Sequence, residues 1–249
     1  MNKWLILVMG LIAFAFLFWY FQGGAERIRQ WKTAERLRVA AKAVDPEEQI
    51  RLYTSAIESD PSSAEAYNNR GNAWDDKGDH DKAIADYTKA IELNPQLARV
   101  YYNRGTAYCR KGDHDRAIAD FTKAIELNPQ YATAYNNRGN AYGRKGDLQK
   151  AIADCTKAIE LNTQYPEAYY TRGLAYECKG DCDNAIADFT KAIELNPQYA
   201  AAYNNRGVAF YKKKDYAKAW SDVKKCQALR GWVNPDFLKA LRQASGRDE

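Results

Sequence analysis

Residues 98–131, ARVYYNRGTAYCRKGDHDRAIADFTKAIELNPQY, decide the fold, because the chain repeats this stretch at a constant period. The tetrad Glu-Leu-Asn-Pro near its end, or a close variant, recurs at every step. Its copies occupy residues 58–61, 92–95, 126–129, 160–163 and 194–197. A fixed period of this length is typical of stacked repeats, in which each unit covers the apolar face of the next. We therefore expect an elongated array rather than a closed globule.

Two helical patterns make up each copy. In residues 98–131, Tyr101, Gly105 and Tyr108 fall on one face of a first helix, at spacings of four and three. Gly112 is expected to end that helix, since glycine tolerates a left-handed cap. Asp113 then offers its carboxylate to the free N–H groups of the second helix. The sequence therefore predicts an all-α chain.

The second helix of this copy carries Ala117, Phe121 and Ala124 on its inner face and ends at Asn128 before Pro129. These residues resemble the tetratricopeptide repeat family, whose pattern runs aromatic, glycine, aromatic, Ala, Phe and Pro. The matching residues are Tyr101, Gly105, Tyr108, Ala117, Phe121 and Pro129 in this copy, Tyr67, Gly71, Trp74, Ala83, Tyr87 and Pro95 in the first, and Tyr169, Gly173, Tyr176, Ala185, Phe189 and Pro197 in the fourth.

The resemblance implies a right-handed superhelical solenoid of helix-turn-helix units whose concave wall binds peptides. The expected repeats span 64–97, 98–131, 132–165, 166–199 and, in divergent form, 200–233. A basic helix and a degenerate half repeat precede them in 26–63, with residues 28–43 covering one end. A capping helix and tail follow in 234–249, with Asn234 as N-cap and Leu241 on the apolar face.

An uncharged stretch of 18 residues, WLILVMGLIAFAFLFWYF, runs from residue 4 to 21. A helix of this length spans about 27 Å, near the thickness of the bilayer hydrocarbon. The sequence therefore predicts an N-terminal transmembrane helix within residues 1–25, and a single-pass membrane protein. The basic residues between 22 and 42 favour a cytoplasmic repeat domain. The alternative is a secretory signal cleaved after Ala25, which gives a secreted or periplasmic protein.

Charge is uneven along the chain, whose formal net charge is +5. Residues 1–42 hold seven of the 37 basic residues but only two of the 32 acidic ones, so the remaining chain has no net charge. A nucleic-acid-binding domain usually carries a basic stripe. The composition therefore argues against nucleic acid as a partner.

Arginine stands before the glycine of every repeat, where the family commonly has leucine, and an aspartate follows at a constant distance on the second helix. We expect structural ion pairs, since arginine suits a partly buried, two-pronged carboxylate contact. The alternative is a row of arginines that grips acidic partners. The expected pairs are Arg70 with Asp86, Arg104 with Asp120, Arg138 with Asp154, Arg172 with Asp188 and Arg206 with Asp222.

Polar and aromatic residues lie between the packing positions of each first helix. Asparagines there can donate to and accept from a peptide backbone, and tyrosines add rigid apolar area with a polar tip. The alternative is a merely solvated surface. The expected groove residues are Asn68, Asn69, Asn72, Tyr102, Asn103, Thr106, Asn136, Asn137, Asn140, Tyr170, Thr171, Asn204 and Asn205. Asn68, Tyr102 and Asn136 stand where lysines grip a carboxylate in some family members, which argues against that activity.

Neither an enzyme nor a metal protein is indicated. His80 and His114 occupy equivalent positions, in register with Cys182, but Leu148 interrupts the series and no close ligand spacing exists. No phosphate-binding glycine loop or nucleophile motif occurs, so we expect no catalytic residue and no cofactor. The five cysteines suggest free thiols, with a disulfide between Cys178 and Cys182 left open.

The sequence thus predicts a membrane-anchored scaffold that binds other proteins or peptides through its groove and contacts the membrane through residues 4–21. A secreted or periplasmic assembly factor is the first alternative. A metal-binding or catalytic protein is the second.

Overall fold

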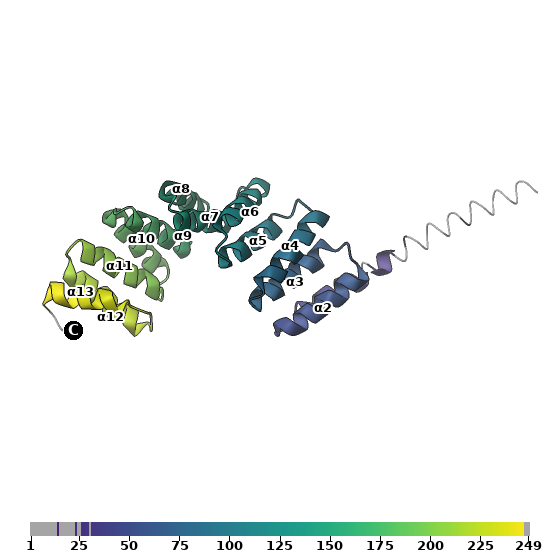
Figure 1. Cartoon of the computed structure of the whole chain (residues 1–249), viewed down its shortest axis with the longest axis horizontal. Coiled ribbons are helices and arrows are strands. Elements are labelled where there is room, and N and C mark those ends of the chain that lie inside the picture. The colour runs from purple at the N-terminus through teal and green to yellow at the C-terminus, as the bar shows by residue number, and fades with distance from the viewer. Residues whose placement is uncertain (1–13, 15–22, 24–25, 30, 247–249) are drawn as a thin grey trace, which may run out of the picture. The chain divides into compact units, whose positions relative to one another are not determined.

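The computed structural model describes residues 14, 23, 26–29 and 31–246, and no strand occurs among them. Residues 26–29 and 31–40 are helical. The helices that follow are labelled in Figure 1. They are α2 (Pro46–Ser59), α3 (Ala64–Asp76), α4 (His80–Leu93), α5 (Ala98–Arg110), α6 (His114–Leu127), α7 (Ala132–Lys145), α8 (Leu148–Leu161), α9 (Pro166–Cys178), α10 (Cys182–Leu195), α11 (Ala200–Lys212), α12 (Tyr216–Ala228) and α13 (Pro235–Ser245).

A short turn joins the two helices of each repeat, and in most repeats glycine makes that turn possible. Gly78, Gly112, Gly146 and Gly180 adopt φ between 79° and 87°, a left-handed conformation that costs glycine little. An aspartate directly before the next helix then caps it, as at Asp113, whose side chain accepts from the Arg116 N–H. The predicted helix stop and N-cap are confirmed in this copy.

Asparagine ends most of the second helices. At Asn94, Asn128, Asn162 and Asn196 the backbone turns to extended φ/ψ, and each side-chain Oδ1 accepts from the N–H two residues on, at 3.0–3.1 Å. Thr163 replaces proline after Asn162, yet that helix ends in the same way. The Asx turn is therefore sufficient without proline.

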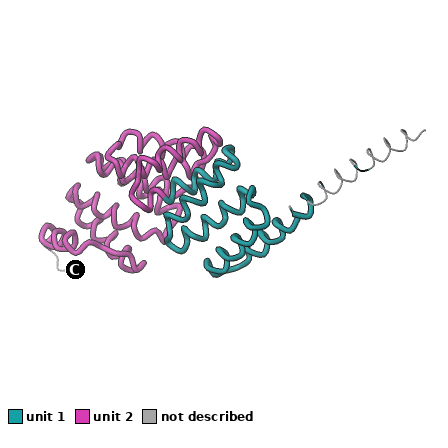
Figure 2. Tube along the Cα trace, turned by 45° about the vertical axis from the view of Figure 1, so that its right-hand side comes forward, with its two compact units in different colours: residues 1–107 teal, residues 108–249 magenta. Residues whose placement is uncertain are grey.

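The chain divides into two compact units, residues 1–107 and residues 108–249 (Figure 2). Within the first unit, Tyr87 and three alanines of α4 and α5 form one core with Val100. A smaller core joins Ala56, Ile57 and Ala66, and Leu37 of the N-terminal helix packs against it. The Arg36 guanidinium also donates to the Ser55 carbonyl at 2.7 Å. The N-terminal helical residues therefore contact α2, while their role in covering one end of the array stays a prediction.

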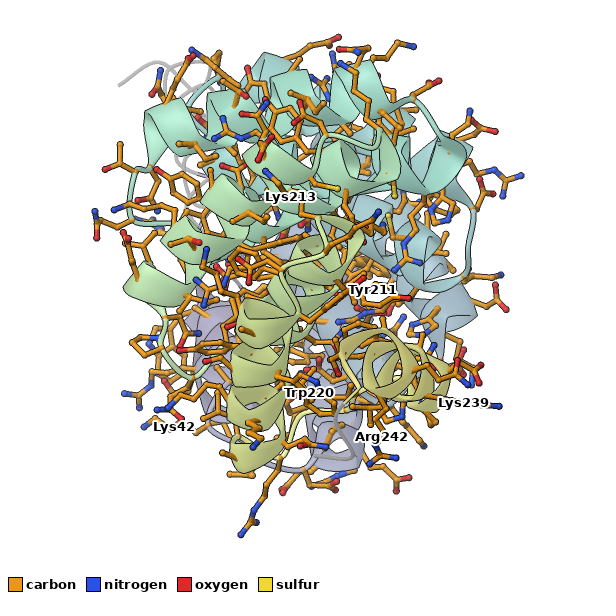
Figure 3. All side chains as sticks on the ribbon, turned by 90° about the vertical axis from the view of Figure 1, so that its left-hand side faces the viewer. Lys42, Tyr211, Lys213, Trp220, Lys239 and Arg242 are labelled. Carbon is orange, nitrogen blue, oxygen red and sulfur yellow. The ribbon has the colours of Figure 1, made fainter. Side chains whose placement is uncertain are left out.

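Within the second unit each helix from α6 to α13 contacts the next, as in a helical-repeat solenoid. The core of its C-terminal part includes Trp220, Val223 and Leu241. Asn234 caps α13 by accepting from the Asp236 N–H, and the Trp220 indole donates to Ser245 Oγ at 3.0 Å. Figure 3 labels Trp220 on α12 and Arg242 on α13. The predicted C-terminal segment thus contains the helix α13, while its role as a cap and the superhelical hand stay predictions.

The predicted membrane anchor, residues 4–21, lies outside the described residues apart from Phe14. In the part of the chain that is described, no helix is long and apolar enough to span a bilayer. A span needs about 20 predominantly apolar residues, whereas α2 to α13 have 11 to 14 residues each and expose one polar face. We therefore correct the prediction of a single-pass membrane protein with a cytoplasmic repeat domain, and no localisation is assigned in its place.

The turn between α11 and α12 departs from the other repeats, and this departure predicts a stabilising substitution. Lys214 stands where the preceding repeats have glycine and adopts φ 62°. A residue with a Cβ is strained in this region by roughly 1–2 kcal/mol. Lys214→Gly is therefore expected to raise the free energy of unfolding by about 1 kcal/mol, measured by urea denaturation followed by circular dichroism.

The reverse change at the equivalent position provides the control. Gly180 has φ 83° in the preceding repeat, so Gly180→Lys should lower the free energy of unfolding by a similar amount. An unchanged or lower urea midpoint for Lys214→Gly would show that the turn is not strained.

Candidate functional site

Arginine and aspartate connect the two helices of a repeat through paired hydrogen bonds. In the first unit, Arg70 Nε and Nη2 donate to the two Asp86 carboxylate oxygens at 2.7 and 2.8 Å. In the second unit, three more pairs share this geometry. They are Arg138 with Asp154, Arg172 with Asp188, and Arg206 with Asp222, at 2.7–2.9 Å.

These carboxylates are buried and the arginines half-buried. Hydrogen bonding to the carboxylate raises the pKa of Arg172 above its already high ordinary value. The geometry fits the structural interpretation of the arginines, because the guanidinium is engaged and not offered to a partner. Arg104 and Asp120 lie on opposite sides of the boundary between the units, so their pairing stays a prediction.

A threonine of the preceding repeat accepts the remaining donor of the guanidinium. Arg172 Nη1 donates to Thr156 Oγ1 at 3.0 Å, and Arg206 Nη1 donates to Thr190 Oγ1 at the same distance. Arg70 with Thr54, Arg104 with Thr88 and Arg138 with Thr122 form the same contact. Where both contacts are made, the arginine binds one helix of its own repeat and one of the repeat before. We call this three-residue contact the Arg–Asp–Thr clip.

Asparagines link successive first helices in the first unit. Asn103 Nδ2 donates to both Asn68 Oδ1 and Asn72 Oδ1 at 3.0 Å. Tyr87 Oη also donates to Asn72 Oδ1, at 2.8 Å. Several of the predicted groove residues therefore hold the repeats together. Asn68 is only 1% exposed.

In the second unit a different pair connects the first helices. Asn205 Nδ2 of α11 donates to Tyr170 Oη of α9 at 2.9 Å, and Asn204 Nδ2 donates to Asn205 Oδ1 at 3.0 Å. The Tyr170 ring lies 4.8 Å from that of Tyr199, centroid to centroid. Burial raises the pKa of Tyr170, so its hydroxyl stays protonated near neutral pH.

None of the predicted groove residues is fully exposed. Asn68, Asn136 and Thr171 are buried. The half-buried ones are Asn69, Asn72, Tyr102, Asn103, Thr106, Asn137, Asn140, Tyr170, Asn204 and Asn205.

Two of the asparagine oxygens are buried without a hydrogen-bond partner. They are Asn136 Oδ1 on α7 and Asn204 Oδ1 on α11. Both residues occupy the repeat position of Asn68, whose Oδ1 accepts from Asn103. Thr171 stands in the place of Asn103 after Asn136, and its hydroxyl donates instead to the Glu167 carbonyl at 2.8 Å. An unpaired buried acceptor costs about 1–3 kcal/mol, which favours an incoming N–H or O–H group.

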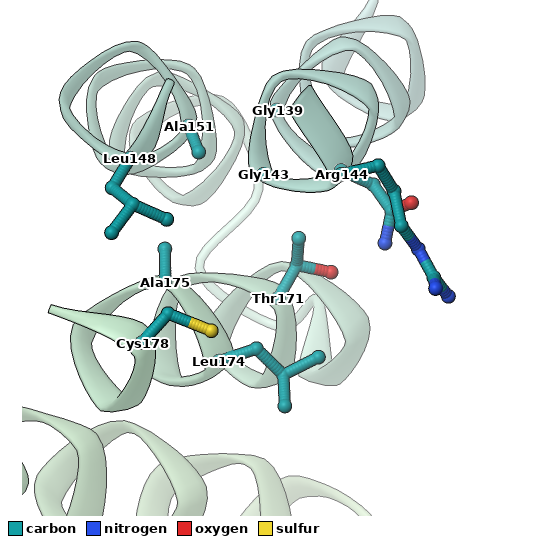
Figure 4. A pocket seen from close by; sticks show the side chains of 10 residues that line it. Gly139, Gly143, Arg144, Leu148, Ala151, Thr171, Leu174, Ala175 and Cys178 are labelled. Carbon is teal, nitrogen blue, oxygen red and sulfur yellow. The ribbon is translucent and has the colours of Figure 1, made fainter. Parts of the chain in front are cut away.

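A cavity of about 330 Å³ lies between α7, α8 and α9 (Figure 4). Its wall is mostly apolar or small, with Asn140 and Thr171 as polar members. In Figure 4 the side chains of Leu148, Ala151 and Ala175 face one another across it, while Arg144 points away. The lining residues are Gly139, Asn140, Gly143, Arg144, Leu148, Ala151, Thr171, Leu174, Ala175 and Cys178.

All five cysteines belong to the described part of the chain and carry free thiols. Cys178, at the cavity, is exposed, and Cys182 is half-buried. Burial raises the pKa of Cys155 to about 12 and that of Cys109 to about 11, so both stay protonated and unreactive at neutral pH.

The histidines show no metal site. His80 Nδ1 lies 2.6 Å from Asp75 Oδ1, and His114 Nδ1 is buried without a partner. Among the described residues, no three histidine, cysteine or acidic side chains gather closely enough to hold a metal ion.

The sequence of this chain matches known protein families, and its fold resembles solved structures. The family description "Tetratricopeptide repeat" matches residues 64–97, 132–165 and 86–119, and the description "TPR repeat" matches residues 105–146 and 178–214. No curated protein sequence matches with significance.

Among solved structures, MamA has 32% sequence identity to this chain and superposes with a TM-score of 0.59. The match covers 64% of this chain and 94% of MamA. YrrB, described as a TPR protein with an unusual peptide-binding site, is 27% identical, with 78% and 97% covered and a TM-score of 0.60. A tetratricopeptide repeat protein from Parabacteroides merdae is 19% identical, with 86% and 87% covered and a TM-score of 0.71, and shows the fold alone.

The Arg–Asp–Thr clip predicts strong coupling between Arg172 and Asp188. Removing either partner leaves a largely buried charge, so each alanine substitution should cost about 3 kcal/mol of unfolding free energy. The double mutant should cost less than the sum, with a coupling of at least about 1 kcal/mol by urea denaturation.

The exposed pair Lys157–Glu160, whose side chains are 46% and 59% exposed, is the control for this cycle. Its coupling should stay below about 0.5 kcal/mol. Additive losses at Arg172 and Asp188 would show that the clip does not stabilise the repeat.

Substituting alanine for each of two glycines of α7 should change the stability in opposite directions. A Cβ at Gly139 would lie 2.8 Å from Cys155 Sγ, whereas a Cβ at Gly143 meets only the Ala151 methyl group, at 3.9 Å. Gly143→Ala should therefore stabilise by about 0.5–1 kcal/mol, through better helix propensity. Gly139→Ala should destabilise by about 1–3 kcal/mol through overpacking. Thermal unfolding checks both, and equal effects would contradict the close contact seen only at Gly139.

Proposed function

The chain belongs to the tetratricopeptide repeat family, and from that premise we propose that it is a non-catalytic scaffold that binds a peptide segment of another protein along its first helices. Members of the family bind other proteins or peptides, and the fold is typically an interaction scaffold. The similarity to YrrB, with its peptide-binding site, supports the same class of partner.

One observation carries the proposal. In the second unit, Tyr170, Asn204 and Asn205 form a continuous set of hydrogen-bonded side chains across α9 and α11. We call these three residues the polar row. They are half-buried, so their rotamers are restrained before any partner arrives. Binding to a preorganised surface loses less side-chain entropy than binding to a mobile one.

The chemistry of the polar row suits a peptide backbone. An asparagine amide offers both donors and an acceptor, which match the carbonyl and N–H groups of an extended segment. The buried Asn204 Oδ1 has no partner, and a peptide N–H would relieve that cost. The Tyr170 ring, which is tilted by 37° against the nearby Tyr199 ring, supplies apolar contact area.

Peptide selection on the intact chain tests the proposal. A displayed library of short random peptides is selected on the full-length protein, and affinities are measured by fluorescence anisotropy. Selected peptides should bind saturably. Asn205→Ala and Tyr170→Phe should each weaken binding by about tenfold or more, because each breaks the bond between α9 and α11.

Lys157→Ala is the matched control, since Lys157 is exposed and pairs with Glu160 on α8, away from the polar row. Its affinity should equal that of the wild type, and circular dichroism should show that all three variants remain folded. Failure to enrich any saturable binder, or equal binding by all variants, would refute the polar row as a peptide site.

A further inference from the structure

Three side chains in or next to the first repeat are replaced at the equivalent positions in or next to the third repeat. In the first repeat, Asn72 Oδ1 accepts from Tyr87 Oη at 2.8 Å and from Asn103 Nδ2 at 3.0 Å. Two periods on, Asn140 stands where Asn72 stands. Cys155 then replaces Tyr87, and Thr171 replaces Asn103. Both donors that serve Asn72 are therefore absent beside Asn140.

A third replacement adds space on the same helix. Where the first repeat has Asp75, which contacts His80, the third has Gly143 followed by Leu148. The fifth repeat fills the equivalent place with Tyr211 and Tyr216, whose rings lie 5.9 Å apart. Gly143 has no side chain to place there, and a Cβ would find only Ala151 within 4 Å.

The cavity between α7, α8 and α9 lies at these replacements. Gly143 and Thr171 line it, and Cys155 Sγ lies next to the lining residue Gly139. Its volume of about 330 Å³ exceeds what a single ring requires, since an apolar cavity of about 150 Å³ accommodates benzene. Small and aliphatic side chains line it, among them Ala151, Leu148 and Leu174 (Figure 4). A charged occupant is disfavoured, because the only charged side chain at the wall, Arg144, points away from the cavity in Figure 4.

We propose that this cavity binds the side chain of a tyrosine supplied by a partner peptide. The ring takes the space that Tyr87 and Phe189 fill in their own repeats, and the phenol O–H donates to Asn140 Oδ1 as Tyr87 Oη donates to Asn72. A phenylalanine would fill the space but offer no donor to that acceptor. The inference rests on the proposed scaffold function, because it assumes that the tyrosine belongs to a peptide bound by the scaffold.

Small phenols test the cavity without any knowledge of the partner. The full-length chain is titrated with p-cresol, the side-chain analogue of tyrosine, and separately with toluene, the analogue of phenylalanine. Binding is followed by two-dimensional NMR and by the rate at which iodoacetamide alkylates Cys178, which lines the cavity. We expect saturable p-cresol binding, slower alkylation of Cys178, and about fivefold weaker binding of toluene.

Two variants at Cys155 distinguish the effect of filling the cavity from the effect of removing the thiol. Cys155→Phe restores the residue that the second and fourth repeats have as Phe121 and Phe189, so it should fold and abolish p-cresol binding. Cys155→Ala removes the thiol without filling the space and should keep it. Asn140→Ala should reduce the affinity for p-cresol to that for toluene.

Three results would overturn the inference. They are the absence of saturable p-cresol binding in both the wild type and Cys155→Ala, unchanged binding in Cys155→Phe, and equal affinities for p-cresol and toluene. The p-cresol titration tests whether the cavity binds a phenol, while the selected peptides test the scaffold function. If those peptides lose affinity on Asn205→Ala but p-cresol does not bind, the cavity inference alone fails.

Discussion

The Arg–Asp–Thr clip is the contact on which the register of the repeats depends. A helix pair cannot bury its apolar face alone, so each must be covered by a neighbour. Hydrophobic association, however, is non-directional. The guanidinium of Arg172 supplies direction, because its planar donors reach Asp188 in its own repeat and Thr156 in the one before. Buried alanines such as Ala158 and Ala168 allow the helices to approach closely. Together with the hydrogen bonds of the arginine, they determine the position of each helix pair.

Sequence spacing could predict half of this contact. Arginine and aspartate recur at a constant separation in every copy, and opposite charges in constant register indicate a pair. The threonine was missed, although its signal is present, since Thr156 precedes Arg172 by the same interval as Thr190 precedes Arg206. Because that threonine belongs to the preceding copy, only a comparison across the repeat boundary reveals it. Helix ends were predictable for a similar reason, since Asn162 stops its helix by a local hydrogen bond even without proline.

The asparagines show where spacing is insufficient. Asn68 and Asn204 occupy the same repeat position, and the sequence pattern assigned both to a groove. In the structure Asn68 is nearly inaccessible and accepts from Asn103, whereas Asn204 is half-buried with an unpaired oxygen. The difference comes from the surroundings in space, which supply an amide donor in one case and no donor in the other. The cavity is also beyond single-position reasoning, because residues of three helices line it, among them Gly143, Ala151 and Thr171.

Repeats that are alike in sequence give each helix pair the same surface, so a scaffold distinguishes partners through the positions that differ. Cys155 is such a position, and its chemistry limits what it can contribute. Burial raises its pKa to about 12, so the thiol is a poor nucleophile near neutral pH. What distinguishes it from Tyr87 and Phe189 is therefore its size. A small residue at this point leaves space that Tyr87, Phe121 and Phe189 fill with a ring in their own repeats, and this difference in size is the basis of the ring-binding proposal for the third repeat.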